Sequence, residues 1–324
     1  MNLDAAILRA LRSAAWVSGA ELSNRLGVTR AAIWARIEEL RSLGYEVEAS
    51  PHSGYRLLGC PDRLHADDLL SRIGAARVVG RDIRVFQETG STSDVLERLA
   101  RDGVREGLVV FAESQTRGRG RLGRPWVSPP GRGIWFSVLL RPLLRPQAAT
   151  RLTVAAAIAL ARAIRREIPL KPEIKWPNDV MIHGRKVAGV LTELSGELDS
   201  VRHLILGIGV NANLVRDDFP PDLHASATSL RLELGRPIDR AALAAALLEE
   251  LDAAYDCVTD DRFAPLADEW SAQCTTLGRD VSVVTGNRRI HGLAEALDSE
   301  GALLVRTEHG RLERIVGGDV TLEK

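Results

Sequence analysis

The chain has 324 residues, with 43 basic and 43 acidic side chains, so its formal net charge at pH 7 is zero. A neutral chain is unlike a protein whose whole surface coats nucleic acid, although it can contain one small DNA-binding module. Its length predicts two or three domains, and its 45% hydrophobic residues are enough to form their cores.

Cysteine usage and hydropathy predict a cytoplasmic protein. Cys60, Cys257 and Cys274 are odd in number and widely spaced, so they form neither a disulfide framework nor a metal-binding pattern. The longest apolar segment, Leu152–Leu160, is much shorter than the roughly 20 residues of a membrane-spanning helix. Charged residues interrupt the first apolar stretch, so we expect no signal peptide and no membrane partner.

Residues 1–60 predict a winged helix-turn-helix module. Asp4 can cap a first helix, Ser18 begins a capping box for a second, and Thr29 can cap a third. Two short β segments on either side of a Pro-His-Ser-Gly turn at 51–54 would form the wing. The third helix would then enter the major groove of DNA.

The residues expected to contact DNA lie on this third helix and on the wing: Thr29, Arg30, Trp34, Arg36, Arg41 and Arg56. The module has seven arginines and six acidic residues, so the charge pattern for phosphate binding is weak. A small protein-contacting module is therefore the alternative interpretation of residues 1–60.

Between residues 65 and 270, strand patterns alternate with helix patterns. The predicted strands are Ile83–Gln87, Leu108–Ala112, Ile134–Leu140, Val187–Glu193 and Leu204–Val210. The predicted helices are Ser93–Asp102, Thr150–Arg166 and Arg240–Val258. A His183-Gly184 turn predicts a hairpin, so we expect a mixed sheet with helices packed against it rather than a doubly wound parallel sheet.

A third module is expected at residues 277–324. Its predicted strands are Val281–Val284, Ile290–Ala296, Ala302–Arg306 and Leu312–Val316. Short strands joined by glycine-containing turns predict a small β-barrel. The chain would then comprise residues 1–60, 65–270 and 277–324, with a linker near 59–62, in an α+β fold.

One stretch of the middle region is unusually basic. Residues 114–166 contain eleven arginines and no acidic residue, although the whole chain is neutral. The stretch begins with Gly118-Arg119-Gly120-Arg121-Leu122-Gly123-Arg124, which we call the glycine–arginine loop, and Trp126 follows it. Glycines let a backbone approach a ligand closely, and arginines match phosphate and carboxylate oxygens. We expect a loop that folds over an anion, and a flexible surface loop is the alternative.

Two lysines follow in segments that also predict chemistry. In Lys175-Trp176-Pro177-Asn178-Asp179, Lys175 would contact phosphates and Asn178 or Asp179 would lie near Mg²⁺, although Asn-Asp is also a common turn. Lys186 shares one strand face with small or apolar residues, and a lysine in such a place usually has a charged partner. The sequence therefore predicts a cationic site built from separate segments.

Two further segments contain glycine and hydroxyl residues. The hydroxyls of Ser91, Thr92 and Ser93 can cap a helix, or they can bind a polar group of a ligand. Gly207 and Gly209 lie in the predicted strand Leu204–Val210, just before Asn211, and their missing side chains permit close approach of a ligand.

These motifs resemble biotin–protein ligases, and the added N-terminal module resembles the bifunctional biotin ligase and biotin operon repressor family. The resemblance is strongest in Gly118–Arg124, in Lys175–Asp179 and in Lys186-Val187-Ala188-Gly189, and it extends over all three modules. It implies a winged helix-turn-helix, a catalytic domain similar to class II aminoacyl-tRNA synthetases, and an SH3-like barrel.

The resemblance implies an activity and its partners. Such enzymes join biotin to ATP as biotinyl-5′-AMP, with Mg²⁺ screening the pyrophosphate, and then transfer biotin to a lysine of a biotin carboxyl carrier protein. It also implies that the adenylate-bound protein forms a homodimer on operator DNA, and that carrier and second protomer compete for one sheet edge.

The resemblance also implies roles for individual residues. Catalysis is expected from Lys186, Arg121 and Arg119, and Trp126 is expected to act as a lid. Biotin is expected to contact Ser91, Thr92, Ser93, Gln115, Gly118, Arg119, Gly120, Arg121, Lys186 and Gly189. ATP is expected to contact Arg121, Arg124, Lys175, Asn178, Lys186 and Asn211, with Asn178 and Asp179 near Mg²⁺.

Three other functions remain open from the sequence. The first is a ligand-sensing transcription regulator without ligase activity, which would not need a cationic site for an ATP phosphate. The second is a lipoate ligase, which shares the sheet architecture. The third is a monofunctional biotin ligase whose N-terminal module does not bind DNA.

Overall fold

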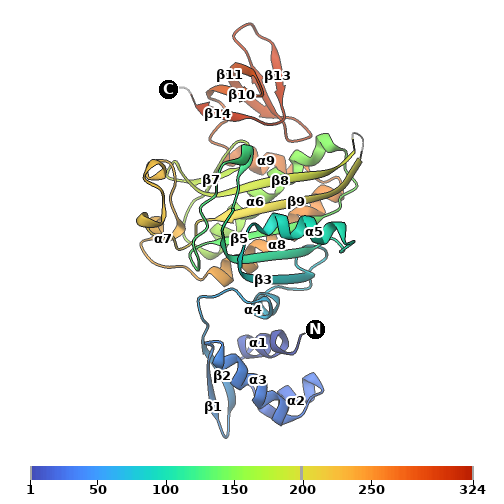
Figure 1. The fold of residues 1–324 in the computed structure, drawn as a ribbon, viewed down its shortest axis with the longest axis vertical. Helices are drawn as coiled ribbons and strands as arrows, with labels where there is room; N and C mark the ends of the chain where they lie inside the picture. Colours follow the sequence, from blue (N-terminus) through green and yellow to red (C-terminus); the bar gives the residue numbers. More distant parts are fainter. Residues whose placement is uncertain (1, 198–199, 323–324) are drawn as a thin grey trace.

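The computed structural model describes residues 2–197 and 200–322, which form three units along the long axis of the molecule (Figure 1). The N-terminal helices lie at one end, a large sheet with its helices lies in the middle, and a small β unit lies at the other end. Within the described residues, no helix combines the length and the hydropathy needed to cross a membrane.

The N-terminal unit has the predicted order of helices and strands. It contains α1 (Leu3–Ser13), α2 (Gly19–Leu26), α3 (Arg30–Ser42), β1 (Glu46–Ser50) and β2 (Gly54–Gly59), with β1 antiparallel to β2. Ser18 and Thr29 cap α2 and α3 as predicted, since their side chains accept from Glu21 N and Ala32 N. A buried cluster that includes Ile7, Leu22 and Ile37 joins the three helices.

The middle unit is a seven-stranded sheet of order β3-β4-β5-β9-β8-β7-β6. Its strands are β3 (Asp82–Thr89), β4 (Leu108–Gln115), β5 (Ile134–Leu140), β6 (Glu173–Lys175), β7 (Asp179–Ile182), β8 (Arg185–Glu197) and β9 (Ser200–Val210). β3 and β4 are parallel and the other neighbouring strands of this sheet are antiparallel, so the predicted mixed sheet is confirmed.

Helices cover the two faces of this sheet unequally. One face packs against α4 (Ala66–Arg72), α6 (Thr150–Glu167), α8 (Arg240–Thr259) and α9 (Ala264–Gln273), which form the main core. On the other face, α5 (Thr92–Arg101) packs against Val110, Leu139 and Ile205. Since α5 has only ten residues, it leaves part of that face for the site described below.

The C-terminal unit is a five-stranded antiparallel sheet of order β13-β12-β11-β10-β14. Its strands are β10 (Asp280–Thr285), β11 (Arg288–Leu297), β12 (Leu303–Arg306), β13 (Leu312–Ile315) and β14 (Asp319–Leu322). Sequence patterning predicted the first four strands and missed β14. Thr275 N donates to Ile174 O at 2.8 Å and Trp176 N donates to Thr276 Oγ1 at 3.1 Å, which attaches this unit beside β6.

Polar contacts dock the N-terminal unit on the middle unit. Arg9 of α1 donates to the backbone carbonyls of Leu70 and Ile73, where the last turn of α4 has no helical partners.

The linker has a contact of its own with the middle unit. Arg240 of α8 contacts Asp62 Oδ1 at 2.7 Å and Glu113 Oε2 at 2.8 Å, and its side chain is completely buried. The linker is therefore held to the core by a buried charge network.

Candidate active site

A cavity of about 700 Å³ opens on the face of the sheet beside α5. Its walls are the glycine–arginine loop, the β6–β7 hairpin, the segment 225–227 and the start of β14. Most of the predicted small-molecule site residues line this cavity: Ser91, Thr92, Ser93, Gln115, Arg119, Gly120, Arg121, Arg124, Trp126, Lys175, Asn178, Asp179, Lys186, Gly189 and Asn211. Segments more than 100 residues apart therefore form one site.

Glycines form the floor of the cavity, and Trp126 lies on them. A Cβ atom on Gly209 would lie 2.6 Å from the Trp126 ring, and one on Gly189 would lie 3.2 Å from it. A Cβ on Gly118 would lie 2.6 Å from the carbonyl oxygen of Trp126. Only glycine leaves this space, and in the structure the Trp126 ring makes the close approach to the strands that the sequence analysis expected of a ligand. Trp126 was predicted as a lid, but its ring rests against the sheet and forms part of the floor.

Lys186 has a charged partner, as was expected for a lysine on a largely apolar strand face. Its Nζ lies 2.5 Å from Asp179 Oδ1, and both side chains are about a quarter exposed at 29% and 24%. A bulge between Val180 and Met181 shifts the pairing of β7 with β8 and places the two charges side by side. The Lys186 ammonium also lies 5.1 Å from the centre of the Trp126 ring. Lys186 is thus held at the cavity wall by an acid and an aromatic face.

Arg121 points from the loop to the β6–β7 hairpin. Its Nη1 donates to Asn178 Oδ1 at 3.1 Å, and Asn178 Nδ2 donates to Val190 O at 2.8 Å. Burial lowers the pKa of the Arg121 guanidinium, and the nearby charge of Asp319 raises it, but an arginine stays protonated. Among the described residues, no carboxylate forms an ion pair with Arg121, so its charge is available to an anion.

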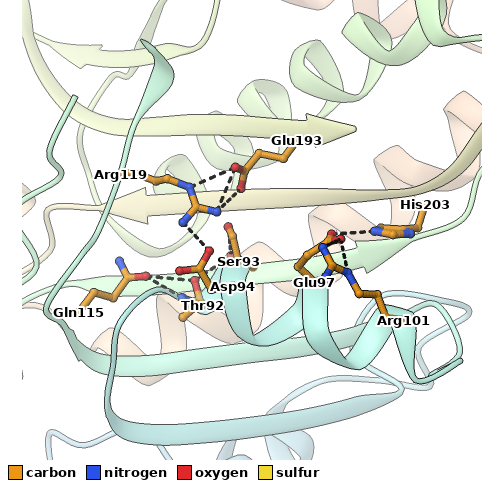
Figure 2. Close-up of polar contacts among 10 residues, drawn as sticks. Thr92, Ser93, Asp94, Glu97, Arg101, Gln115, Arg119, Glu193 and His203 are labelled. Atoms are coloured by element: carbon orange, nitrogen blue, oxygen red, sulfur yellow. Dashed lines mark hydrogen bonds and ion pairs between the residues drawn. The ribbon is translucent and has the colours of Figure 1, made fainter. Parts of the chain in front are cut away.

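Arg119 has a different environment from Arg121 (Figure 2). Its Nη1 donates to Asp94 Oδ1 at 2.7 Å, and its Nε and Nη2 donate to the two oxygens of Glu193 at 3.1 and 3.0 Å. The side chain therefore bridges α5 and β8, and its charge is already balanced by two carboxylates. This geometry does not support the predicted catalytic role of Arg119.

A buried hydroxyl pocket occupies the α5 side of the cavity. Thr92 N donates to Gln115 Oε1 at 2.9 Å, and the hydroxyls of Thr92 and Ser93 lie 2.7 and 3.0 Å from Ser137 Oγ. Ser91 occupies the N-cap position of α5, but its side chain makes no capping hydrogen bond. The hydroxyls at the start of α5 therefore line the cavity instead of serving only as helix caps.

Ser137 is a site residue that the sequence analysis missed. It lies in the apolar strand β5, lines the cavity and is completely buried. A single serine within the apolar segment Ile134–Leu140 indicates a polar contact in the core, because a buried polar side chain needs a hydrogen-bond partner. The partners, however, are 44 and 45 residues away in the chain, so the sequence could not identify them.

Changing Ser137 to alanine should weaken binding of the small-molecule substrate. The change leaves the Thr92 and Ser93 hydroxyls without a shared partner, and lost hydrogen bonds of this kind are worth about 1 kcal/mol. We expect KM for that substrate to rise roughly fivefold while kcat changes less. A serine that is only structural would instead lower the thermal midpoint and leave KM unchanged.

The predicted Mg²⁺ ligands do not fit that role. Asn178 uses its carbonyl oxygen for Arg121, and Asp179 is paired with Lys186. The described residues contain no group of three or more histidine, cysteine or acidic side chains that could hold a metal ion. Of the predicted ATP contacts, Asn211 also has a structural bond, because its amide donates to Thr228 O at 3.0 Å.

The predicted DNA-contacting residues divide into two groups. Arg36 donates to Asp4 at 2.6 Å, Arg41 donates to Val47 O at 2.9 Å, and Arg56 donates to Glu48 at 2.6 Å. These three arginines have partners within the module, and their expected contacts with DNA stay predictions. Arg30 and Trp34 are exposed on α3, with Trp34 58% exposed, and the Thr29 side chain caps that helix.

Three family models match separate parts of the chain. Residues 85–211 match the biotin/lipoate A/B protein ligase family, residues 5–56 match a helix-turn-helix domain, and residues 276–322 match the biotin protein ligase C-terminal domain. The three matches correspond to the three units of the structure.

Individual relatives match nearly the whole length. The bifunctional ligase/repressor BirA of Bacillus subtilis is 38% identical over 95% of this chain and 94% of its own. The BirA of Escherichia coli is 32% identical over 94% of this chain and 92% of its own. Among solved structures, the biotin protein ligase of Aquifex aeolicus with biotin and ATP has a TM-score of 0.64 and 30% identity, covering 75% of this chain and 99% of that one.

Proposed function

Because this chain belongs to the biotin/lipoate A/B protein ligase family and has the modules of its bifunctional ligase/repressors, we propose that it activates biotin with ATP and transfers biotin to a lysine of a biotin carboxyl carrier protein. The observation that carries this proposal is the single cavity that contains Lys186, Arg121 and Lys175 next to a buried hydroxyl pocket. The cations suit the phosphates, and the pocket suits a small polar ring.

In the first step, a carboxylate oxygen of biotin attacks the α-phosphorus of ATP. A new P–O bond forms, the bond to the β-phosphate breaks, and pyrophosphate leaves with the electron pair. Both reactants are anions that repel each other, so a cation between them stabilises the transition state. Lys186, held at the wall by Asp179, is the group in position for that task, and Arg121 is the second.

In the second step, the amine of the carrier lysine attacks the carbonyl carbon of biotinyl-5′-AMP. An amide bond forms, AMP leaves with the electrons of the broken C–O bond, and the amine loses a proton. Neither step needs a covalent bond to the enzyme. The glycine–arginine loop lines the cavity above the Trp126 ring, and a loop closed there would limit access of water to the reactive anhydride.

The hydroxyl pocket fits the polar ring of biotin better than it fits a phosphate. Ser91, Thr92, Ser93 and Gln115 offer neutral donors and acceptors, and all of them line the cavity. Neutral hydrogen bonds suit an uncharged urea group, whereas arginine and lysine suit phosphates. This division supports the proposal that biotin binds on the α5 side and the nucleotide phosphates bind near Lys175 and Arg121. Mg²⁺ would arrive on the ATP phosphates, which are its usual ligands in such sites.

The ligase proposal is tested by labelling a biotin carboxyl carrier domain. The protein should transfer biotin only when biotin and ATP are both present, and addition of lipoate should not compete. Labelling with lipoate in place of biotin would make the chain a lipoate ligase. Absence of pyrophosphate release with biotin and ATP would instead favour a ligand-sensing regulator.

We further propose that the N-terminal module binds operator DNA when the adenylate-bound protein forms a homodimer. Support comes from the helix-turn-helix match at residues 5–56 and from the repressor activity named for the relatives. Arg30 and Trp34 are the exposed α3 residues that can face the major groove. Sedimentation with biotin and ATP should show the dimer, and an unchanged sedimentation coefficient would contradict it.

Changing Arg30 to alanine is expected to weaken DNA binding about tenfold, because an arginine contact to DNA is worth about 1–3 kcal/mol. The probe is a DNA fragment selected from a random pool by the unmodified protein with biotin and ATP. Arg63→Ala is the matched control, since Arg63 is exposed outside the module. Equal affinities of the two variants would exclude Arg30 from the interface, and ligase activity should not change in either.

A further inference from the structure

The three arginines of the glycine–arginine loop have three different kinds of partner. The loop folds back on itself, since Gly120 N donates to Arg124 O at 2.8 Å and Arg124 N donates to Arg121 O at 3.2 Å. The outer two arginines, Arg119 and Arg124, pair with carboxylates of neighbouring elements. The middle one, Arg121, contacts an uncharged amide in the cavity.

Two carboxylates hold the first end of the loop (Figure 2). Arg119 donates three hydrogen bonds, one to Asp94 on α5 and two to Glu193 on β8. The side chains of Asp94 and Glu193 are 44% and 36% exposed, and neither residue lines the cavity. Their charges are therefore directed to the loop and not to the substrate.

One carboxylate of the C-terminal unit holds the other end. Arg124 forms an ion pair with Asp319, the first residue of β14. A Cβ atom on Gly318 would lie 2.7 Å from Val284 O, so only glycine lets the chain turn so close to β10 just before Asp319. Hydrogen bonds of Thr275 and Thr276 hold the start of the C-terminal unit beside β6, and Asp319 of that unit lies at the cavity rim.

Holding both ends has a consequence for the residue between them. An unrestrained loop of this kind loses conformational entropy when it closes on a ligand, which weakens binding. With Arg119 and Arg124 anchored, less of that entropy remains to be lost when Arg121 engages a phosphate. The carboxylates that hold the two ends belong to different units, so the C-terminal unit takes part in closing the site.

We propose that Arg119 and Arg124 are positioning residues that anchor the loop, through Asp94 and Glu193 at one end and Asp319 at the other, so that Arg121 retains the adenylate. This inference rests on the proposed ligase function and assigns different roles to the three arginines of the loop. Arg119 is thereby assigned to anchoring and not to catalysis, and Arg124 to anchoring and not to phosphate binding.

The test is the time course of pyrophosphate release with biotin, ATP and Mg²⁺ but no carrier. A burst reports adenylate formation, and the slow phase after it reports adenylate release from the site. The variants are Asp319→Asn and the double change Asp94→Asn with Glu193→Gln. Exposed ion pairs of this type change rates roughly twofold to fivefold, so we expect a faster slow phase by that factor for Asp319→Asn and roughly tenfold for the double change. The burst rate should change by a smaller factor than the slow phase, because Lys186 is not part of the loop and keeps its place at the cavity wall.

The matched control is Glu295→Gln. Glu295 also pairs with an arginine of the C-terminal unit, Arg306, but it lies outside the cavity. Glu295→Gln should leave both phases unchanged. Asp319→Asn should also increase labelling of bystander lysines in added serum albumin, because escaped adenylate reacts outside the enzyme.

A charge swap separates anchoring from phosphate binding. Arg124→Asp alone should release adenylate faster, and Arg124→Asp with Asp319→Arg should restore retention because the ion pair is formed again. A swap that stays as leaky as Arg124→Asp would overturn the proposal, since Arg124 would then act on the ligand itself. A slow phase that is unchanged in Asp319→Asn and in the double change would also overturn it.

Failure of the ligase function itself looks different in the same experiment. If the unmodified protein shows no burst with biotin and ATP, the ligase proposal fails and the anchors are irrelevant to it. If the burst is normal but the anchors have no effect on the slow phase, only the anchoring proposal fails.

Discussion

Replacing Lys186 by alanine should lower the rate of adenylate formation by a factor of about 100–1,000, the range observed when a preorganised charge or donor at a transition state is removed. The reacting carboxylate and α-phosphate are both negative, and Lys186 is the ammonium that the structure holds at the cavity wall against Asp179. The measurement is the burst of pyrophosphate release with biotin and ATP, together with labelling of a carrier domain.

The fold should survive this change. The Lys186 side chain is 29% exposed and its backbone bonds to Ser226 and Thr228 remain. Lys171→Ala is the matched control, because Lys171 is exposed and lies outside the cavity. A burst within a few-fold of the unmodified rate in Lys186→Ala would remove Lys186 from the mechanism, whatever the result for the control.

Replacing Arg240 by methionine should destabilise the middle unit by about 3–5 kcal/mol, the cost of breaking a buried ion pair from one side. Glu113 is 5% exposed and would keep its negative charge in the core without its guanidinium partner. The linker should loosen as well, since Arg240 also bonds Asp62 Oδ1 and Asp62 O. Urea unfolding followed by circular dichroism measures the loss.

Glu113→Gln in the Arg240→Met background tests whether the unpaired charge of Glu113 causes the destabilisation. It removes the unpaired charge, so it should recover more than about 1 kcal/mol of the loss. Arg236→Met is the control, because Arg236 is exposed four residues before Arg240. If the double variant were no more stable than Arg240→Met, the destabilisation would come from lost packing and not from the unpaired carboxylate.

The arginines of the glycine–arginine loop could be assigned to an anion site from the sequence, but their separate roles could not. The glycine–arginine loop was expected at an anion site, and the structure places its arginines at one cavity with Lys186 and Lys175. The loop consists of glycine and arginine apart from Leu122, so its composition alone distinguishes it from the rest of the chain. Its internal division of roles was not predicted, because Asp94, Glu193 and Asp319 are 25, 74 and 195 residues from their partners.

Arg36 shows the opposite case. Its place on the predicted recognition helix favoured a DNA contact, but it pairs with Asp4, which is 32 residues away. A helical position shows which residues share a face, and it does not show which charged residue another segment brings to that face. Asp179 is similar, since its turn position suggested a metal ligand until the β7–β8 register placed it beside Lys186.

Short-range interactions were sufficient to predict the helix caps at Ser18 and Thr29, the hairpin at His183-Gly184 and the cationic loop, because each depends on residues close together in the chain. Pairing between distant segments required the folded structure: the Ser137 hydroxyl cluster, the Lys186–Asp179 pair, the Arg240 network and the Asp319 anchor. Their geometry is set by strand register and by the docking of whole units. Many acidic residues of a neutral chain could pair with each arginine, and only packing selects one.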